Sequence, residues 1–243
     1  MSPKLTRAPV ALLSLALVAF LAACSVSQVL VIKADGSGTA SMRVETTKLF
    51  REYLLNLQEV TGAAPAADGR VFDVKALQKE LEARPGLTVK KVASPSPDVL
   101  EVDLAYRSVQ EVYGSAESVK ASGILVYSEA AGKKSFKVHI DRKNFKELSG
   151  VFPALGSAVF EGIAPQEQDT ISEAEYLDMI QFSLGPDGPA LLKKSFIDLT
   201  VKPEGEILSQ VGGTVVNGAV TFRIPLIKLL VLDKPLDYSL TWK

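Results

Sequence analysis

Residues 28–46, QVLVIKADGSGTASMRVET, set the architecture of the chain. They begin with a β-branched run that ends at the turn residues Asp35-Gly36-Ser37-Gly38, and a second run of strand-forming residues continues to Thr46. Two such runs on either side of an Asp-Gly turn are typical of a β-hairpin. We therefore expect the domain to begin with two antiparallel strands.

Two helices are expected after this hairpin. Apolar side chains recur every three or four positions in residues 47–60, which indicates one face of an amphipathic helix. Asp73 is placed to cap a shorter helix that ends at Pro85-Gly86. Between the two helices, residues 62–69 (GAAPAADG) have the composition of a linker or loop.

The middle of the chain has the alternating hydrophobicity of half-buried strands. Between Leu87 and Ile140, apolar residues take every second position in four segments. Ser94-Pro95-Ser96-Pro97, a short helix within residues 108–120 and the turn Ala130-Ala131-Gly132-Lys133 are expected to separate these segments. The pattern predicts antiparallel strands with one buried face, and no parallel crossover pattern is present.

Helical patterns return in the second half of the chain. Residues 143–163 are rich in apolar side chains, and Ser172 with Glu175 forms a capping box for a further helix that residues 185–189 end. Strands are then expected at residues 197–201, 207–211, 215–220 (with an Asn-Gly turn) and 236–242. This order predicts an α+β fold with helices packed on one side of a mainly antiparallel β-sheet.

Leu21-Ala22-Ala23-Cys24, just before the first expected strand, is predicted to be a lipobox. It ends an apolar run that follows a short basic start with Lys4 and Arg7. This layout is that of a bacterial lipoprotein signal, so residues 1–23 are expected to be removed and the sulfur of Cys24 to carry a diacylglycerol. The alternatives are a buried core cysteine and an uncleaved membrane helix, although the apolar run is shorter than the roughly 20 residues that a bilayer needs.

Removal of the signal leaves 220 of the 243 residues, which we expect to form a single α+β domain, residues 24–243. The chain has 27 Lys and Arg against 28 Asp and Glu, and a balance of this kind does not attract nucleic acid by bulk electrostatics. Cys24 is the only cysteine, so the chain by itself forms no disulfide, thiolate zinc site or iron–sulfur cluster. We expect no cofactor.

The lipid on Cys24 defines the expected location. Three residues, Ser25, Val26 and Ser27, precede the first expected strand and reach on the order of 15 Å, so the domain is expected to lie on a membrane to which its acyl chains attach it. The location is then the bacterial cell envelope. Ser25 replaces the aspartate that retains lipoproteins at the inner membrane in some diderm bacteria, which favours the outer membrane.

Candidate catalytic and metal-binding residues are few. His139 is the only histidine, and its expected strand turns it to solvent; no Gly-x-Ser-x-Gly elbow surrounds a serine. The candidate oxygen ligands for calcium are Glu167, Asp169, Glu173, Glu175 and Asp178. Their spacing does not match a calcium loop, and acidic residues at a helix start are favoured by the helix dipole. We expect neither a catalytic nor a metal site.

Residues 224–232, IPLIKLLVL, are too short and too charged for a membrane span. They are interpreted as a helix or strand of the core, with a lip that dips into the bilayer and a wall of an apolar ligand pocket as alternatives. The aromatic residues also available to line an apolar cavity are Phe145, Phe152, Phe160 and Phe182.

The lipobox, the β-run that ends in Asp35-Gly36-Ser37-Gly38-Thr39, and the strand and helix that follow resemble the start of LppM-like bacterial envelope lipoproteins. The resemblance covers about the first third of the chain and carries over no ligand-contacting residue. It implies a noncatalytic α+β envelope domain with an apolar cavity of the kind that holds lipid.

Three functions remain open. The first is a lipid-anchored, non-catalytic envelope protein that binds an apolar or lipid ligand, or a protein partner, at the membrane surface. The second is a structural or assembly lipoprotein that docks onto an envelope complex through a sheet edge. The third is an envelope hydrolase that uses His139. A continuous apolar cavity would favour the first function, and a filled core with an exposed edge strand would favour the second.

Overall fold

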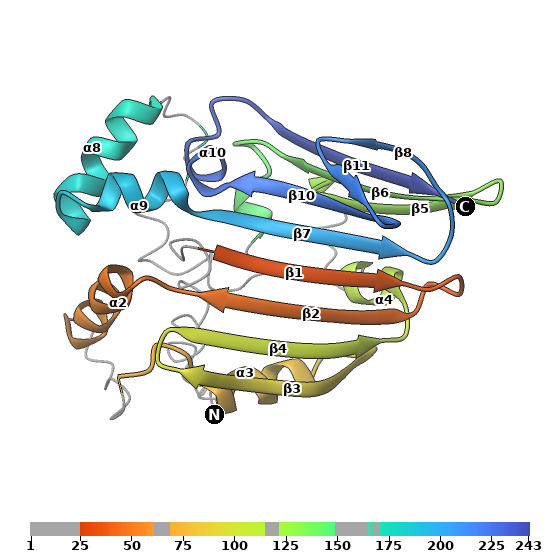
Figure 1. Ribbon diagram of the computed structural model, residues 1–243, viewed down its shortest axis with the longest axis horizontal. Coiled ribbons are helices and arrows are strands. Elements are labelled where there is room, and N and C mark those ends of the chain that lie inside the picture. The colour runs from red at the N-terminus through yellow and green to blue at the C-terminus, as the bar shows by residue number, and fades with distance from the viewer. Residues whose placement is uncertain (1–24, 61–68, 115–121, 149–164, 166, 168–170) are drawn as a thin grey trace, which may run out of the picture.

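The computed structural model describes residues 25–60, 69–114, 122–148, 165, 167 and 171–243, and their strands form two sheets (Figure 1). The larger sheet has seven strands in the order β3-β4-β2-β1-β7-β10-β9, and the smaller has four in the order β5-β6-β11-β8. The strands are β1 (Ser25–Ile32), β2 (Gly38–Glu45), β3 (Leu87–Ser96), β4 (Val99–Tyr106), β5 (Leu125–Ala130), β6 (Lys133–Ile140), β7 (Phe196–Pro203), β8 (Ile207–Val211), β9 (Thr214–Val216), β10 (Ala219–Pro225) and β11 (Leu236–Trp242). The helices are α2 (Lys48–Val60), α3 (Val74–Glu82), α4 (Val109–Gly114), the short η2 (Phe145–Glu147), α8 (Glu173–Leu184), α9 (Gly188–Lys194) and α10 (Leu226–Val231). The predicted α+β class is confirmed.

The expected N-terminal hairpin is formed by β1 and β2, which pair antiparallel from Ser25–Glu45 to Ile32–Gly38. Val26, Leu30 and Ile32 point to the buried face of the sheet, as alternation along a strand requires. Gly38 closes the hairpin at a crowded point, because a Cβ there would lie 1.8 Å from the Val31 carbonyl oxygen. Only glycine fits this position without movement of the backbone.

One pairing was not expected from the sequence. β1 pairs in parallel with β7, from Ser25 opposite Phe196 to Ile32 opposite Pro203, whereas the hydrophobic pattern showed no parallel crossover. The other pairings in both sheets are antiparallel. Periodicity shows which face of a strand is buried but not which distant strand lies beside it. The sheet is therefore mainly antiparallel, with one parallel pair at its centre.

Two boundaries also differ from the prediction. β3 continues through Pro95 to Ser96 instead of ending before it, which an edge strand tolerates because proline's missing N–H then faces no partner. A further helix, α9, starts within residues 185–189, at Gly188, with Pro189 in its first turn. Proline is favoured there because the first N–H groups of a helix have no partner in the helix.

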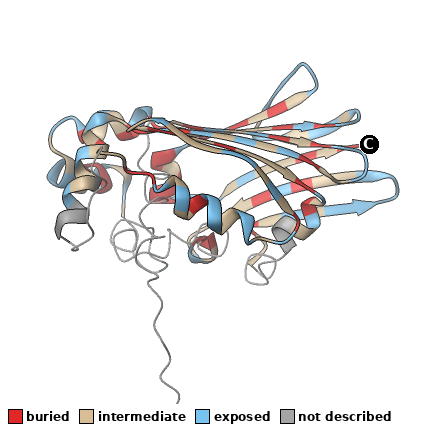
Figure 2. Ribbon diagram, turned by 90° about the horizontal axis from the view of Figure 1, so that it is seen from below, coloured by how far each residue is buried: buried red, intermediate tan, exposed pale blue. Residues whose placement is uncertain are grey.

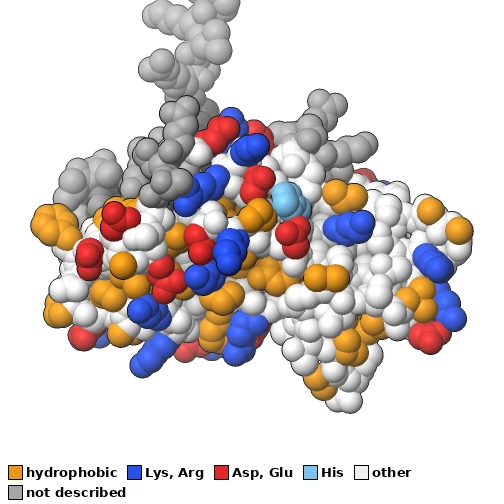
Figure 3. All heavy atoms as spheres, turned by 90° about the horizontal axis from the view of Figure 1, so that it is seen from above, with side chains coloured by type: hydrophobic (Ala, Val, Ile, Leu, Met, Phe, Trp, Pro, Cys, Tyr) orange, Lys and Arg blue, Asp and Glu red, His pale blue; other side chains and the backbone are white. Residues whose placement is uncertain are grey.

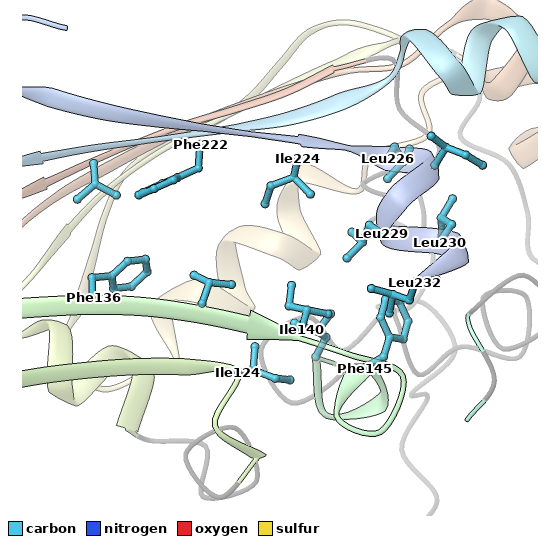
Figure 4. Packing of buried hydrophobic residues seen from close by; sticks show 14 of the residues in the cluster. Ile124, Phe136, Ile140, Phe145, Phe222, Ile224, Leu226, Leu229, Leu230 and Leu232 are labelled. Atoms are coloured by element: carbon cyan, nitrogen blue, oxygen red, sulfur yellow. The ribbon is translucent and has the colours of Figure 1, made fainter. Parts of the chain in front are cut away.

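The core lies between the sheets and under two helices. Side chains of β10 such as Phe222 and Ile224 point toward Phe136 and Ile140 of β6 across the space between the sheets (Figure 4). The rest of the inner face of the larger sheet packs on α2 and α3 through a second cluster: Val26, Val44, Phe50, Val71, Phe72, Leu77, Leu100 and Val102. Figure 2 shows buried residues concentrated along the strands where these layers meet. The smaller sheet thus covers part of the face that was expected to be covered by helices alone.

The outer face of the larger sheet is polar and carries cross-strand ion pairs. Lys91 and Arg43 both contact the Glu101 carboxylate, at 2.7 Å and 2.5 Å. Arg223 binds Asp198 through two hydrogen bonds of 2.8 Å and 2.7 Å. The cationic side chains of these pairs are exposed and the carboxylates are partly exposed, so the pairs contribute little to stability. Among the helices of the described residues, none is both long and apolar enough to cross a membrane.

Candidate functional site

The end of the molecule where β1 begins is the first candidate site. β1 starts at Ser25, three residues earlier than expected, and Ser25 lies opposite Glu45 of β2 and Phe196 of β7. The lipobox residues Leu21 to Cys24 lie outside the described residues, so their lipidation stays a prediction. Because Ser25 is already in the sheet, a lipid on Cys24 would be attached about one residue, or roughly 3.5 Å, from the folded domain.

A small apolar hollow lies beside this end, where α2, α8 and α9 meet. It has a volume of about 30 Å³. Its lining residues are Thr47, Leu49, Phe50, Tyr176, Ile180, Leu184, Gly188, Leu191, Leu192, Ser195 and Leu230. Such a volume holds about one or two water molecules and is far smaller than an acyl chain.

The hydroxyl groups of Thr47 and Ser195 in the lining form hydrogen bonds with the backbone of the adjacent helices, α2 and α9. Thr47 Oγ1 accepts a hydrogen bond from Phe50 N at 3.3 Å, and Ser195 Oγ donates to the Leu191 carbonyl at 2.8 Å. Burial raises the pKa of the Tyr176 phenol above its ordinary value of 10.0, because the ionised form is poorly solvated there. The hollow therefore presents apolar surface and neutral groups.

The segment 224–232 belongs to the core, as the preferred interpretation predicted. It forms the end of β10 and then α10, whose Leu226, Leu229 and Leu230 are buried (Figure 4). Leu232, just after α10, takes a left-handed backbone conformation and is also buried. A lip that inserts these side chains into a bilayer is excluded, and only Leu230 of α10 reaches the hollow.

The space between the sheets is filled by large side chains. Trp242 of β11 and Phe222 of β10 are essentially inaccessible to solvent, and Phe222 packs edge-on against Tyr238 with ring centroids 5.6 Å apart. Phe145 joins this core, whereas Phe152 and Phe160 lie outside the described residues. The described residues between the sheets thus form a packed apolar core.

Phe182 was considered available to line an apolar cavity, but the structure places it at the surface. Its side chain is 93% exposed, the most exposed of the large hydrophobic residues described. α8 buries Tyr176, Leu177 and Ile180, and Phe182 lies on the opposite side of the helix. The sequence contained this signal, because position 182 falls outside the stripe that residues 176, 177, 180 and 184 form.

His139 faces solvent, as predicted, but it has acidic neighbours that the sequence did not identify. Its Nδ1 lies 2.7 Å from Asp237 Oδ1 on the adjacent β11, and its Nε2 lies 3.6 Å from Asp141 Oδ2. The hydrogen bond to Asp237 is the main cause that raises the pKa of His139 above 6.5. Figure 3 shows the histidine, in pale blue, at the surface beside acidic side chains.

This arrangement is that of a charged surface cluster. Both imidazole nitrogens face carboxylates, which stabilises the protonated ring, whereas a catalytic histidine directs one nitrogen to a carboxylate and the other to a nucleophile. Asp141 is held by the backbone N–H groups of Lys143 and Asn144, each at 2.9 Å, and its pKa is lowered chiefly by the bond from Asn144.

Two of the acidic residues considered for calcium, Glu173 and Glu175, have other partners. Glu175 accepts from the backbone N–H of Ser172 in the predicted capping box, and Glu173 pairs with Lys228 at 3.0 Å. Asp169 lies outside the described residues. The described part of the chain contains no group of three or more histidine, aspartate or glutamate side chains able to hold a metal ion.

The two sheets end side by side at β8 and β9. β8 is an edge of the smaller sheet and β9 an edge of the larger, and only Gly212 and Gly213 connect them. This pair of edges exposes four hydrophobic side chains: Leu208 (38%), Val211 (58%), Val215 (48%) and Val216 (59%). We call them the valine edge. The opposite edge, β3, instead carries Lys90, Lys91, Pro95 and two register shifts, which are features that discourage strand addition.

No protein-family model matches the chain, and no curated protein matches it in sequence. Among solved structures, it is similar to the folded domain of the Mycobacterium tuberculosis LppM protein, determined by NMR, with a TM-score of 0.41 and 12% identity over 90% of this chain and 88% of that one. This neighbour agrees in part with the resemblance noted from the sequence. With a TM-score below 0.5, no property of LppM is transferred to this chain.

Proposed function

We propose that this chain is a lipid-anchored, non-catalytic protein of the bacterial cell envelope that docks a protein partner through its valine edge. The observation that carries the docking is the edge of exposed apolar side chains, which lies beside a packed apolar core of described residues. The anchor is supported by the lipobox at Leu21 to Cys24 and by the start of β1 at Ser25. Ser25 favours the outer membrane as the site of attachment.

The valine edge supports docking for a physical reason. An edge strand offers unpaired backbone N–H and C=O groups to another strand, and exposed β-branched side chains offer apolar area to the same partner. The two edges of the larger sheet are not equivalent. β3, at one edge, carries lysines and a proline, whereas β9, at the other edge, carries exposed valines. A partner strand is therefore expected beside β9, extending over β8.

Site-specific photo-crosslinking in intact cells tests this proposal. A photoreactive amino acid at Val216 is expected to give a discrete crosslinked product of higher mass, whereas the same residue at Thr88, exposed on β3 of the same sheet, is the matched control. Equal products from both positions, or none from Val216, would contradict docking at this edge.

The hollow between α2, α8 and α9 supports a second candidate, an apolar ligand bound near the membrane. Its apolar lining favours such a ligand, although its volume of about 30 Å³ requires side chains to move before an acyl chain enters. Native mass spectrometry of the protein purified with bacterial lipid tests this. A bound lipid mass that is lost when Ile180 is replaced by Trp would support it, and a mass with no bound lipid would exclude it.

A further inference from the structure

We propose that the tip formed by the last turn of α8 and by α9 contacts the membrane, with Phe182 inserted among the lipid headgroups and Lys193 and Lys194 facing their phosphates. This proposal rests on lipid attachment at Cys24, and it adds how the domain is oriented on the bilayer. The occupant of the surface is therefore a lipid bilayer.

Exposure of Phe182 is the first observation. The other exposed large hydrophobic residues are between 38% and 59% accessible, and Phe182 is 93% accessible. A phenylalanine almost wholly in water at the end of a helix gains from transfer into the headgroup region, where aromatic rings are favoured. The core does not need it, since α8 is held by Tyr176, Leu177 and Ile180.

Position in the fold is the second observation. α8 and α9 lie at the end of the molecule where β1 starts (Figure 1), and α2, α8 and α9 share the lining of the hollow. α9 ends at Lys194, and after Ser195 comes Phe196, which lies opposite Ser25. With about one residue between Ser25 and the lipid, the bilayer has to lie close to this end.

Charge is the third observation. Lys193 and Lys194 are exposed, and neither has an ion-pair partner among the described residues. Glu45, the other neighbour of Ser25, is 3.6 Å from Arg43, which offsets its charge. Lysines close to a membrane surface are attracted by anionic lipids. They also interact favourably with the helix C-terminus, which explains their position in α9 but not their lack of acidic partners.

Two exposed acidic residues limit how deep the contact can be. Asp178 lies one turn before Phe182 on the same side of α8, and Asp187 follows the helix end. Carboxylates are costly to bury in lipid. The inserted part is therefore confined to the last turn of α8, and the rest of the helix stays in water.

The test uses the full, lipidated protein, purified from bacterial membranes and reconstituted into vesicles that contain phosphatidylglycerol. Cys24 is the only native cysteine and is acylated in this account, so Phe182→Cys gives one free thiol for an environment-sensitive NBD probe. Val216→Cys is the matched control, an exposed apolar site on β9. We expect the probe at 182 to shift to the blue, to be quenched by lipids with a shallow nitroxide and to be shielded from aqueous iodide, while the probe at 216 shows none of these changes.

Each contrary outcome has a distinct meaning. Protein that does not float with the vesicles would overturn lipidation, and with it this orientation. Protein that floats while the probe at 182 stays fully quenched by iodide would overturn the orientation and leave lipidation intact. Shielding from iodide without quenching by nitroxide lipids would mean contact with protein, and would also overturn it. Lys193→Gln with Lys194→Gln should reduce the blue shift on phosphatidylglycerol vesicles toward that on phosphatidylcholine vesicles; an unchanged shift would overturn the role of the lysines.

Discussion

Ser25 lies directly opposite Phe196 in the parallel pair of β1 and β7, so the start of the folded domain and the end of α9 meet at one point. This pairing brings the predicted lipid attachment site, the exposed lysines and the tip of α8 to the same end of the molecule. The valine edge lies on a different part of the surface, which leaves it available to a partner while the domain is held on the membrane.

Removal of the lipid should release the domain without unfolding it. We expect a Cys24→Ala variant, with a cleavable secretory signal in place of residues 1–23, to appear in the soluble periplasmic or secreted fraction. Each buried methylene of an acyl chain contributes about 0.8 kcal/mol, so two chains provide most of the attachment. Cell fractionation with circular dichroism checks both points. A folded variant that stays in the membrane would contradict the role of Cys24.

Gly38 should not tolerate a side chain. We expect Gly38→Ala to lower the free energy of unfolding by about 1–3 kcal/mol, because its Cβ would lie 1.8 Å from the Val31 carbonyl oxygen and 2.5 Å from the Tyr106 hydroxyl. That hydroxyl also donates a 2.6 Å hydrogen bond to the same carbonyl. Urea unfolding measures the effect, and Ser41→Ala on the exposed face of β2 is the control, expected to change stability by less than about 0.5 kcal/mol. Equal effects of the two substitutions would contradict this packing.

Local features of the fold were predictable from the sequence. The hairpin at Asp35-Gly36, the caps at Asp73 and Ser172 and the Asn217-Gly218 turn were all confirmed, because each depends on residues close together in the chain. Asn217 and Gly218 both have positive φ, at 50° and 74°, as a two-residue hairpin of this type requires.

Long-range features could not be predicted in the same way. The pairing of β1 with β7, the division into two sheets and the approach of Asp237 to His139 each join segments distant in sequence, and hydrophobic periodicity carries no information about such partners. The exposure of Phe182 was predictable from its helical position. Its position at the same end of the molecule as Ser25 was not predictable, because that position depends on the parallel pairing of β1 with β7.

The His139 cluster should make stability depend weakly on pH. The pKa of His139 is raised mainly by its bond to Asp237, so its contribution is complete below the unfolded-state pKa of about 6.5 and is lost as pH rises through the folded-state pKa. The side chain is 44% exposed, so we expect a loss of less than about 1 kcal/mol between pH 6 and 8. Thermal unfolding across this range measures it. Asp237→Asn should flatten the slope, and the control Asp187→Asn should not; equal slopes in all three proteins would contradict the coupling.

Leu230 should be a stabilising residue that also limits the hollow. Its side chain is 2% exposed and lines the hollow where α2, α8 and α9 meet. We therefore expect Leu230→Ala to lower the free energy of unfolding by about 2–5 kcal/mol. Val216→Ala at the exposed edge should cost less than about 0.5 kcal/mol. Denaturant unfolding of both variants makes the comparison. A small effect at Leu230 would mean that α10 is not part of the core.

Mass spectrometry of the mature N-terminus tests whether the protein is attached to the membrane through Cys24. Trypsin should release a peptide of residues 24–33, CSVSQVLVIK, because Lys33 is the first basic residue after Arg7. We expect this peptide to begin at Cys24 and to carry the mass of a diacylglycerol on its sulfur. A peptide that continues through the bond between Ala23 and Cys24, with a free thiol, would contradict it.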